Sequence, residues 1–365
     1  MRSAFSLLAI VALTWLQPDH AQAYTVKSGF TGGCHEEMTI ALSSAFLDDP
    51  IVENVVVAGG DTWRKLAWEL PGLVGRDLSD QQLFVLFSLV IGVRAPDTGG
   101  HSVSDLSAAR EIAGDPRAET QYLHGLRGRE DDEPDGSQSA LEGTRASIRR
   151  SLGGAAAALE RPVERQISTA PYTLDFYNRF GVPVWEPAYL LGEAAHTLQD
   201  SFAHSIRSDA SDLKTVTYVL NYIDAISTHF VESRDGIAHS RYLDGCVDSD
   251  LVELFAAAQQ ATADLFDAFV RTQNGDEAAV DELLDTWLTL QGGCTLENDF
   301  CDNARWLAAA RRDPTGTYLP GWMLCSSRSQ GSGTIWLGLA GVLLLVGLTV
   351  RRFRTRSRSS IGPSV

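Results

Sequence analysis

The chain has 365 residues and a formal net charge of −17, with 47 Asp and Glu against 30 Lys and Arg. An acidic balance of this size repels the phosphate backbone of nucleic acids and argues against nucleic acid as a partner. The length and the 44% of hydrophobic residues suffice for one large globular domain, which we expect over residues 24–320.

Residues 1–23 are typical of an export signal. Arg2 precedes a short apolar stretch, Phe5 to Leu16, and Ala21-Gln-Ala23 is a small-residue cleavage site. The apolar stretch is too short to span a bilayer comfortably. We therefore expect the mature chain to begin at Tyr24 and to lie outside the cytoplasm.

Helical periodicity dominates the domain, and alternating strand patterns are scarce. Two segments with Pro and Gly, 94–100 and 130–137, are expected to be loops. The predicted fold class is all-α, a multi-helix globular domain. The predicted helices cover residues 36–47, 81–93, 140–158, 187–208, 213–227, 248–272 and 277–290.

The predicted helix over 187–208 carries the most informative pattern, with His196, Asp200 and His204 at i, i+4 and i+8. Residues at this spacing lie along one stripe of a helix. Imidazole and carboxylate groups together suit a zinc-type ion. Leu191 and Phe202 give the helix an apolar background, and buried ionisable groups require pairing or a metal. The alternative is a metal-free helix with two partly exposed histidines.

The string Gly192-Glu-Ala-Ala-His-Thr-Leu-Gln-Asp-Ser-Phe-Ala-His204 resembles the core motif of zinc-dependent phospholipase C and the fungal zinc nucleases. It is more similar still to the heterokaryon-incompatibility branch and its bacterial relatives. The resemblance covers about residues 24–250 and implies an all-α phospholipase C-like domain that holds two or three zinc ions. It implies that His196 and Asp200 are metal ligands and that His204 is the third histidine of that branch.

The same resemblance implies further ligands. His35 occupies the position of the early histidine. Asp97 resembles the loop aspartate that contacts metal and serves as the candidate base, and His124 resembles the histidine that follows it. His101 is an alternative to either of these two.

The last ligand pair has two possible assignments. The classical enzymes use a histidine followed four residues later by an acid. His229 has Glu232 at i+3 only, whereas the resemblance to the bacterial relatives favours Asp224 and His239. We assign the latter pair.

This ligand set predicts hydrolysis of a phosphodiester by a metal-activated water, with Asp97 as the base. The expected substrate is a phospholipid or a small phosphodiester, cleaved as by phospholipase C. Two alternatives stay open: a non-catalytic, surface-displayed protein that binds metal, and a zinc-dependent nuclease. The sequence contains no G-x-S-x-G, Walker A or G-x-G-x-x-G string, which argues against a serine hydrolase and a nucleotide-binding fold.

A membrane anchor is expected at the other end of the chain. A flexible spacer, 321–333, precedes an apolar, uncharged stretch, 334–350, of about 25 Å as a helix. The basic tail, 351–365, carries five arginines and is expected in the cytoplasm. Together they resemble bacterial C-terminal sorting tails of the glycine-glycine or myxobacterial kind. The domain is therefore expected at the cell surface, anchored to the membrane or released after tail processing.

All five cysteines follow the signal segment, and in an exported protein they are disulfide candidates. Cys294 and Cys301 flank a short loop and are the easiest pair. Cys34 and Cys246 are the expected second pair, and Cys325 is left over.

Overall fold

The computed structural model describes residues 34–69, 77–98, 117–131, 135–172, 180–222, 231–239, 242–243 and 249–312. All of them belong to the first of the two units into which the chain divides, Met1–Gly321. The expected signal segment, the apolar stretch 334–350 and the basic tail lie outside the described residues. Among the described helices, none has both the length and the apolar composition that a membrane span requires.

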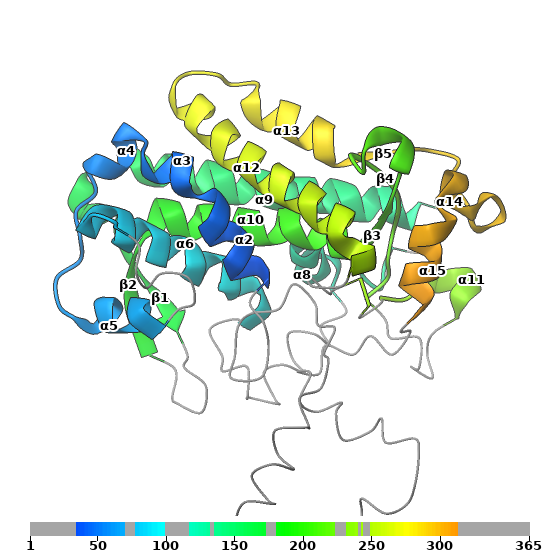
Figure 1. Ribbon diagram of the computed structural model, residues 1–365, viewed down its shortest axis with the longest axis horizontal. Coiled ribbons are helices and arrows are strands. Elements are labelled where there is room, and N and C mark those ends of the chain that lie inside the picture. The colour runs from blue at the N-terminus through cyan, green and yellow to red at the C-terminus, as the bar shows by residue number, and fades with distance from the viewer. Residues whose placement is uncertain are drawn as a thin grey trace, which may run out of the picture. The chain divides into compact units, whose positions relative to one another are not determined.

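Helix α10 (Glu186–Ala203) lies at the centre of the fold, in green in Figure 1. It packs against α6 (Asp80–Thr98), α9 (Gly136–Leu159) and α12 (Val252–Gln273). Every side chain of α10 from Ala194 to Ala203 is buried. A helix that is buried all round must find partners inside the protein for each of its polar side chains.

The predictions for 81–93, 140–158 and 248–272 are confirmed by α6, α9 and α12. The prediction for 277–290 is confirmed over α13, Ala279–Trp287, and is wrong at its end, where Thr289–Leu290 forms strand β5. The predicted helix over 36–47 is divided at Ser43 into α2 and α3. The remaining helices are α2 (Cys34–Leu42), α3 (Ser44–Leu47), α4 (Pro50–Glu53), α5 (Thr62–Glu69), α8 (Ala118–Gln121), α11 (Glu232–Asp235), α13 (Ala279–Trp287), α14 (Asp299–Asp302) and α15 (Ala304–Arg312). The 3-10 turns are η1 (Tyr122–His124), η2 (Val163–Arg165), η3 (Asp209–Ser211), η4 (Ser249–Leu251) and η5 (Leu296–Asn298).

Helix α6 continues through the predicted loop over 94–100 as far as Thr98, with Pro96 inside it. The prediction was therefore wrong for 94–98. Proline removes one backbone hydrogen bond, but the packing of α6 on α10 outweighs this local preference. As a result Asp97 lies in the last turn of a helix, at a fixed position against α10.

Two glycines let α6 and α10 approach to backbone contact. A Cβ atom on Gly92 would lie 1.9 Å from the carbonyl oxygen of Tyr189, and one on Gly192 would lie 2.3 Å from that of Leu89. Only glycine leaves room for such an approach. The end of α6 is thereby pressed onto the middle of α10.

Two small sheets accompany the helices, so the domain is mostly helical and the all-α prediction was wrong in this detail. Strands β1 (Ile167–Tyr172) and β2 (Phe180–Trp185) pair antiparallel, with Ile167 opposite Trp185. Strand β4 (Thr215–Val219) pairs antiparallel with β3 (Ser205–Arg207) and parallel with β5 (Thr289–Leu290).

Strand β4 replaces part of the helix predicted over 213–227, and β3 replaces the end of the one predicted over 187–208. Within β4, Val216 and Tyr218 are buried and belong to a run of β-branched and aromatic residues, which favours strands. Pairing with β3 and β5 satisfies its backbone. Residues 223–227 lie outside the described residues.

The predicted disulfide between Cys294 and Cys301 is confirmed. It closes the segment that contains η5 and the first part of α14. Cys34 is also disulfide-bonded. The proposed partner Cys246, like Cys325, lies outside the described residues.

Replacing Gly192 by alanine is expected to lower the free energy of unfolding by about 1–3 kcal/mol, because the added methyl group must push α6 away from α10. Gly153→Ala is the matched control, since a Cβ atom at that exposed helical position meets nothing within 4 Å. The control is expected to raise stability by about 0.5–1 kcal/mol. Urea unfolding of both variants measures the difference, and a Gly192→Ala protein as stable as wild type would contradict the close approach.

Candidate metal centre

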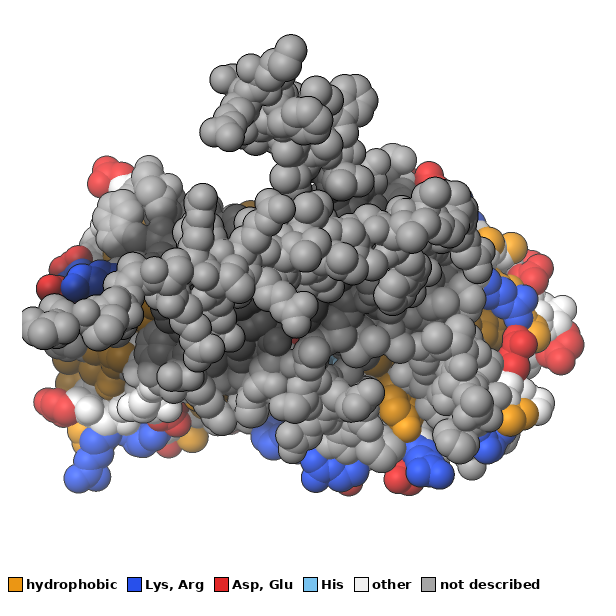
Figure 2. Space-filling view, turned by 90° about the horizontal axis from the view of Figure 1, so that it is seen from below, with side chains coloured by type: hydrophobic (Ala, Val, Ile, Leu, Met, Phe, Trp, Pro, Cys, Tyr) orange, Lys and Arg blue, Asp and Glu red, His pale blue; other side chains and the backbone are white. Residues whose placement is uncertain are grey.

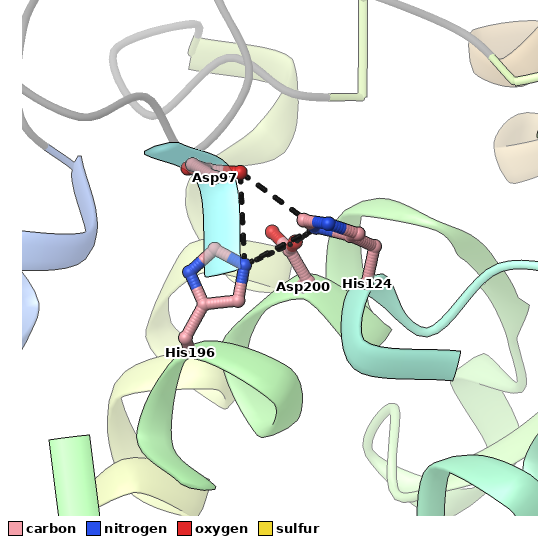
Figure 3. A group of neighbouring side chains, drawn as sticks. All are labelled: Asp97, His124, His196 and Asp200. Atoms are coloured by element: carbon pink, nitrogen blue, oxygen red, sulfur yellow. Dashed lines mark hydrogen bonds and ion pairs between the residues drawn. The ribbon is translucent and has the colours of Figure 1, made fainter. Parts of the chain in front are cut away.

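Four predicted ligands meet between α6, η1 and α10: Asp97, His124, His196 and Asp200. One nitrogen or oxygen atom from each lies within 4.8 Å of those from the other three. Figure 3 shows the four side chains pointing toward one another, His196 and Asp200 from α10, Asp97 from α6 and His124 from η1. We call these four residues the central group.

His196 and Asp200 lie one turn apart on α10, as their spacing predicted. His196 Nε2 is 3.0 Å from Asp200 Oδ2. The ring of His124 reaches the same oxygen, with Nδ1 3.1 Å from Asp200 Oδ2 and 3.3 Å from His196 Nε2. Three ligand atoms from two elements therefore converge on one point.

Asp97 completes the central group from the last turn of α6. Its Oδ1 atom is 3.6 Å from His124 Nδ1 and 3.7 Å from His196 Nε2. The Asp97 side chain is 20% exposed, whereas those of His196 and Asp200 are 0% and 4% exposed. Asp97 is therefore the member of the central group that is most exposed to solvent.

The orientation of the His196 ring is fixed by the backbone of α6. His196 Nδ1 lies 2.9 Å from the carbonyl oxygen of Val93, and since a carbonyl only accepts, Nδ1 carries the proton. Burial is the largest influence on the pKa of His196 and lowers it, assisted by the charge of His35 and opposed by Asp200. The neutral ring therefore directs the lone pair of Nε2 at the two carboxylates.

The centre brings three acceptors together: the lone pair of His196 Nε2, Asp200 Oδ2 and Asp97 Oδ1. Burial raises the pKa of Asp200, but the surrounding imidazoles of His196, His35 and His204 and a hydrogen bond to His124 together hold it well below its usual range. An ionised carboxylate then faces the lone pair of His196 and a second carboxylate. A cation between them satisfies all of these acceptors.

The spacing of the atoms fits such a cation. Two ligands at zinc–nitrogen and zinc–oxygen distances of about 2.0–2.1 Å on a tetrahedral ion are themselves about 3.3 Å apart. The five separations that involve a nitrogen of His124 or His196 run from 3.0 to 3.7 Å, and the two carboxylate oxygens lie within 4.8 Å of one another. The central group could therefore hold a metal ion.

His35 faces the other oxygen of each carboxylate. From α2, its Nε2 atom is 3.0 Å from Asp200 Oδ1 and 4.0 Å from Asp97 Oδ2. Its ring lies beside that of His196, with centroids 4.2 Å apart. Each of the two carboxylates therefore has one oxygen that faces His196 and one that faces His35.

The pKa of His35 is raised to about 9. Burial alone would lower this pKa, but the charge of Asp200, a hydrogen bond to it and the charge of Asp97 together outweigh burial. Without a metal, His35 is therefore protonated at neutral pH. A cation bound at Nε2 would displace that proton.

His124 is placed by a chain reversal against α10. Gly125 follows it with a φ of +61°, and a Cβ atom there would lie 2.8 Å from Ser201 Cα. Beyond the glycine, the backbone of Arg127 donates to Leu220 O at 2.9 Å and accepts from Tyr222 N at 3.1 Å. These contacts hold η1 over the polar face of α10.

His204 and His239 lie beside the central group and do not belong to it. Helix α10 ends at Ala203, and Nδ1 of the next residue, His204, donates to the carbonyl oxygen of His124. Its ring faces that of His239, with centroids 4.8 Å apart. His204 is thus the cap residue that directly follows the helix, with its backbone N–H still 3.0 Å from Asp200 O, and its role as a ligand stays a prediction.

The remaining assignments have different outcomes. Asp224, His101 and His229 lie outside the described residues. Glu232, the possible partner of His229, is exposed on α11 and pairs with Arg311 at 2.6 Å. Sequence reasoning missed Gln199, whose Oε1 atom lies 2.7 Å from His35 Nδ1. Its position inside the α10 motif, next to Asp200, was the signal that could have found it.

No family model matches the chain, and no curated protein or solved structure does either. The buried His and Asp cluster that could hold a metal is a property of the structure itself.

Metal-free protein is expected to lose stability as the pH rises from 6.5 to 9. The pKa of His35 is about 9 in the folded state and 6.5 in the unfolded state. Its contribution to the free energy of unfolding is therefore complete below pH 6.5 and is lost as the pH rises through 9. The contribution is about 3 kcal/mol. Urea unfolding in the presence of a chelator, across this pH range, measures the free energy of unfolding. His35→Gln should lack this part of the pH dependence, and parallel curves for the two proteins would contradict it.

Proposed function

We propose that the protein is an exported, zinc-dependent phosphodiesterase that hydrolyses phospholipid phosphodiesters in the manner of a phospholipase C. The observation that supports this most is the convergence of the His196 lone pair and two carboxylates on one point between α6 and α10. Such a donor set suits zinc, and zinc bound by imidazole and carboxylate is a common hydrolytic centre.

The arrangement supports two ions. The central group would hold the first. His35 Nε2 would hold the second with Asp200 Oδ1 and Asp97 Oδ2, the carboxylate oxygens that face it. Both carboxylates would then bridge the ions, as in the two-metal centres that clamp the attacking and leaving oxygens of a phosphodiester. A third ion is expected only from the resemblance.

In this proposal, two histidines bind the first ion and Asp97 accepts a proton. Bound zinc lowers the pKa of water to about 7 and stabilises charge on the phosphoryl oxygens. His196 and His124 hold the ion from the buried side. Asp97 is the base of this proposal, because its carboxylate is the most exposed of the central group and can accept a proton from an incoming water.

A lipid or a small phosphodiester fits the charge of the chain better than nucleic acid. The net charge is −17, and Figure 2 shows acidic and basic side chains interspersed around the margin of one face of the described part. A nucleic acid would require a basic surface. The apolar stretch expected at 334–350 would keep the domain close to lipid.

The burial of the centre favours one other candidate, a surface-displayed protein that binds metal without catalysis. His35 and His196 are 0% exposed and His124 is 2% exposed. Structural zinc sites are closed in this way, whereas catalytic sites keep an open position. The partly exposed Asp97 is the feature that favours catalysis. A zinc nuclease is a third candidate, which the charge disfavours.

Replacing His196 or Asp200 by alanine is expected to lower phospholipid hydrolysis by about 10³-fold or more and to lower bound zinc, because each removes a ligand of the central group. Asp285→Ala is the control, since this exposed aspartate pairs with Arg145 on α9, away from the centre. Release of phosphorylated headgroup from phosphatidylcholine vesicles and the zinc content of the full chain are measured together.

The outcomes separate the three candidates. Full activity in both ligand variants would contradict the proposal. Stoichiometric zinc without turnover of lipid or nucleotide diesters would support the non-catalytic metal protein. Cleavage of single-stranded nucleic acid that weakens with added salt would support the nuclease.

A further inference from the structure

The buried amide of Gln199 joins three helices at the metal centre. Gln199 lies on α10, is 0% exposed, and bonds to His35 on α2 and to Thr262 on α12. The Nε2 atom of Gln199 lies 3.2 Å from the hydroxyl oxygens of both Thr39 and Thr262. A buried amide without partners would be unfavourable, and here its donor and acceptor atoms both have partners.

Thr262 determines which way the amide faces. Its hydroxyl lies 2.8 Å from the carbonyl oxygen of Ala258 and must donate to it. The hydroxyl oxygen can therefore only accept from Gln199, so the atom of the amide beside it is Nε2. The oxygen Oε1 of Gln199 then faces His35 Nδ1 at 2.7 Å.

The amide in turn determines how His35 can act. Because Oε1 of Gln199 only accepts, Nδ1 of His35 carries the proton and the lone pair available to a metal is on Nε2. Nε2 is the atom that faces Asp200 Oδ1 and Asp97 Oδ2. Hydrogen bonds of this kind orient metal-binding histidines and raise their affinity for the ion.

We propose that Gln199 is a positioning residue, which orients His35 as a ligand of the second ion through the hydrogen bonds that hold it to Thr262 and His35. This inference rests on the proposed function, because it requires two metal ions. The inference goes beyond the proposed function, because it makes the binding of the second ion depend on Gln199, a residue that does not contact the metal. His196 is oriented by a backbone carbonyl, so the first ion does not depend on Gln199.

The test is zinc binding by the full chain, with competition against a chromophoric chelator. Gln199→Met keeps the length of the side chain and removes the acceptor. It is expected to weaken one ion by about 10–100-fold and to leave the other at wild-type affinity. Gln199→Glu retains an oxygen for His35 Nδ1 and is expected to keep both ions.

A matched control is Gln166→Met. Gln166 is also buried, donates to the carbonyl oxygens of Leu159 and Arg161 and accepts from Trp185, all at 3.0 Å, and it contacts no residue of the metal centre. It is expected to keep both ions. Thermal unfolding of each variant establishes that it is folded.

Thr262→Val provides a second variant if Gln199→Met does not fold. It removes the hydroxyl that fixes the amide and is expected to weaken the same ion to a smaller extent. Its control is Thr144→Val, because Thr144 is buried on α9 and makes the same type of bond, to Ala140 O at 2.8 Å.

Two zinc ions at wild-type affinity in both Gln199→Met and Thr262→Val would overturn the inference and leave the proposed function intact. A wild-type chain without stoichiometric zinc would overturn both. The ¹⁵N chemical shifts of His35 in zinc-loaded wild-type protein give a direct check. The proton is expected on Nδ1 and the metal on Nε2, and the reverse assignment would also overturn the inference.

Discussion

The structure depends on the burial of negative charge in the last turn of α10, at Asp200. His196 and Asp200 lie in a segment of α10 that is buried on every side, so water cannot hydrate them. Nδ1 of His196 donates its proton to Val93 O, so the lone pair of Nε2 faces Asp200 and Asp97. Buried acceptors that face one another are stable only with a cation or with additional protons. The same contacts that form the core thus create a site for a positive ion.

The ends of other elements bring the remaining ligands to this point. Asp97 arrives in the last turn of α6, His124 at the end of η1, and His35 near the start of α2. The close contacts of Gly92 and Gly192 hold α6 on α10, so the position of Asp97 is set by backbone packing. Rigid elements place ligands more accurately than loops do. Asp97 is the most exposed member of the group.

The sequence predicted the parts of this site that lie within one helix. His196 and Asp200 could be found because helical periodicity alone puts them on one face of α10. His35, Asp97 and His124 came only from the resemblance, since contacts between distant segments leave no local pattern. Strand β4 was predicted as a helix although its β-branched and aromatic residues favour a strand, and its pairing with β3 and β5 decides its conformation. The end of α10 before His204 has no glycine or proline to mark it.

The most direct test of the metal centre is anomalous diffraction at the zinc edge from crystals of the protein grown with zinc. The account predicts a peak between Asp97, His124, His196 and Asp200, at about 2.0–2.2 Å from His124 Nδ1, His196 Nε2 and one oxygen of each carboxylate. It predicts a second peak beside His35 Nε2. The absence of any peak there, with the carboxylates bonded directly to protonated imidazoles, would contradict it.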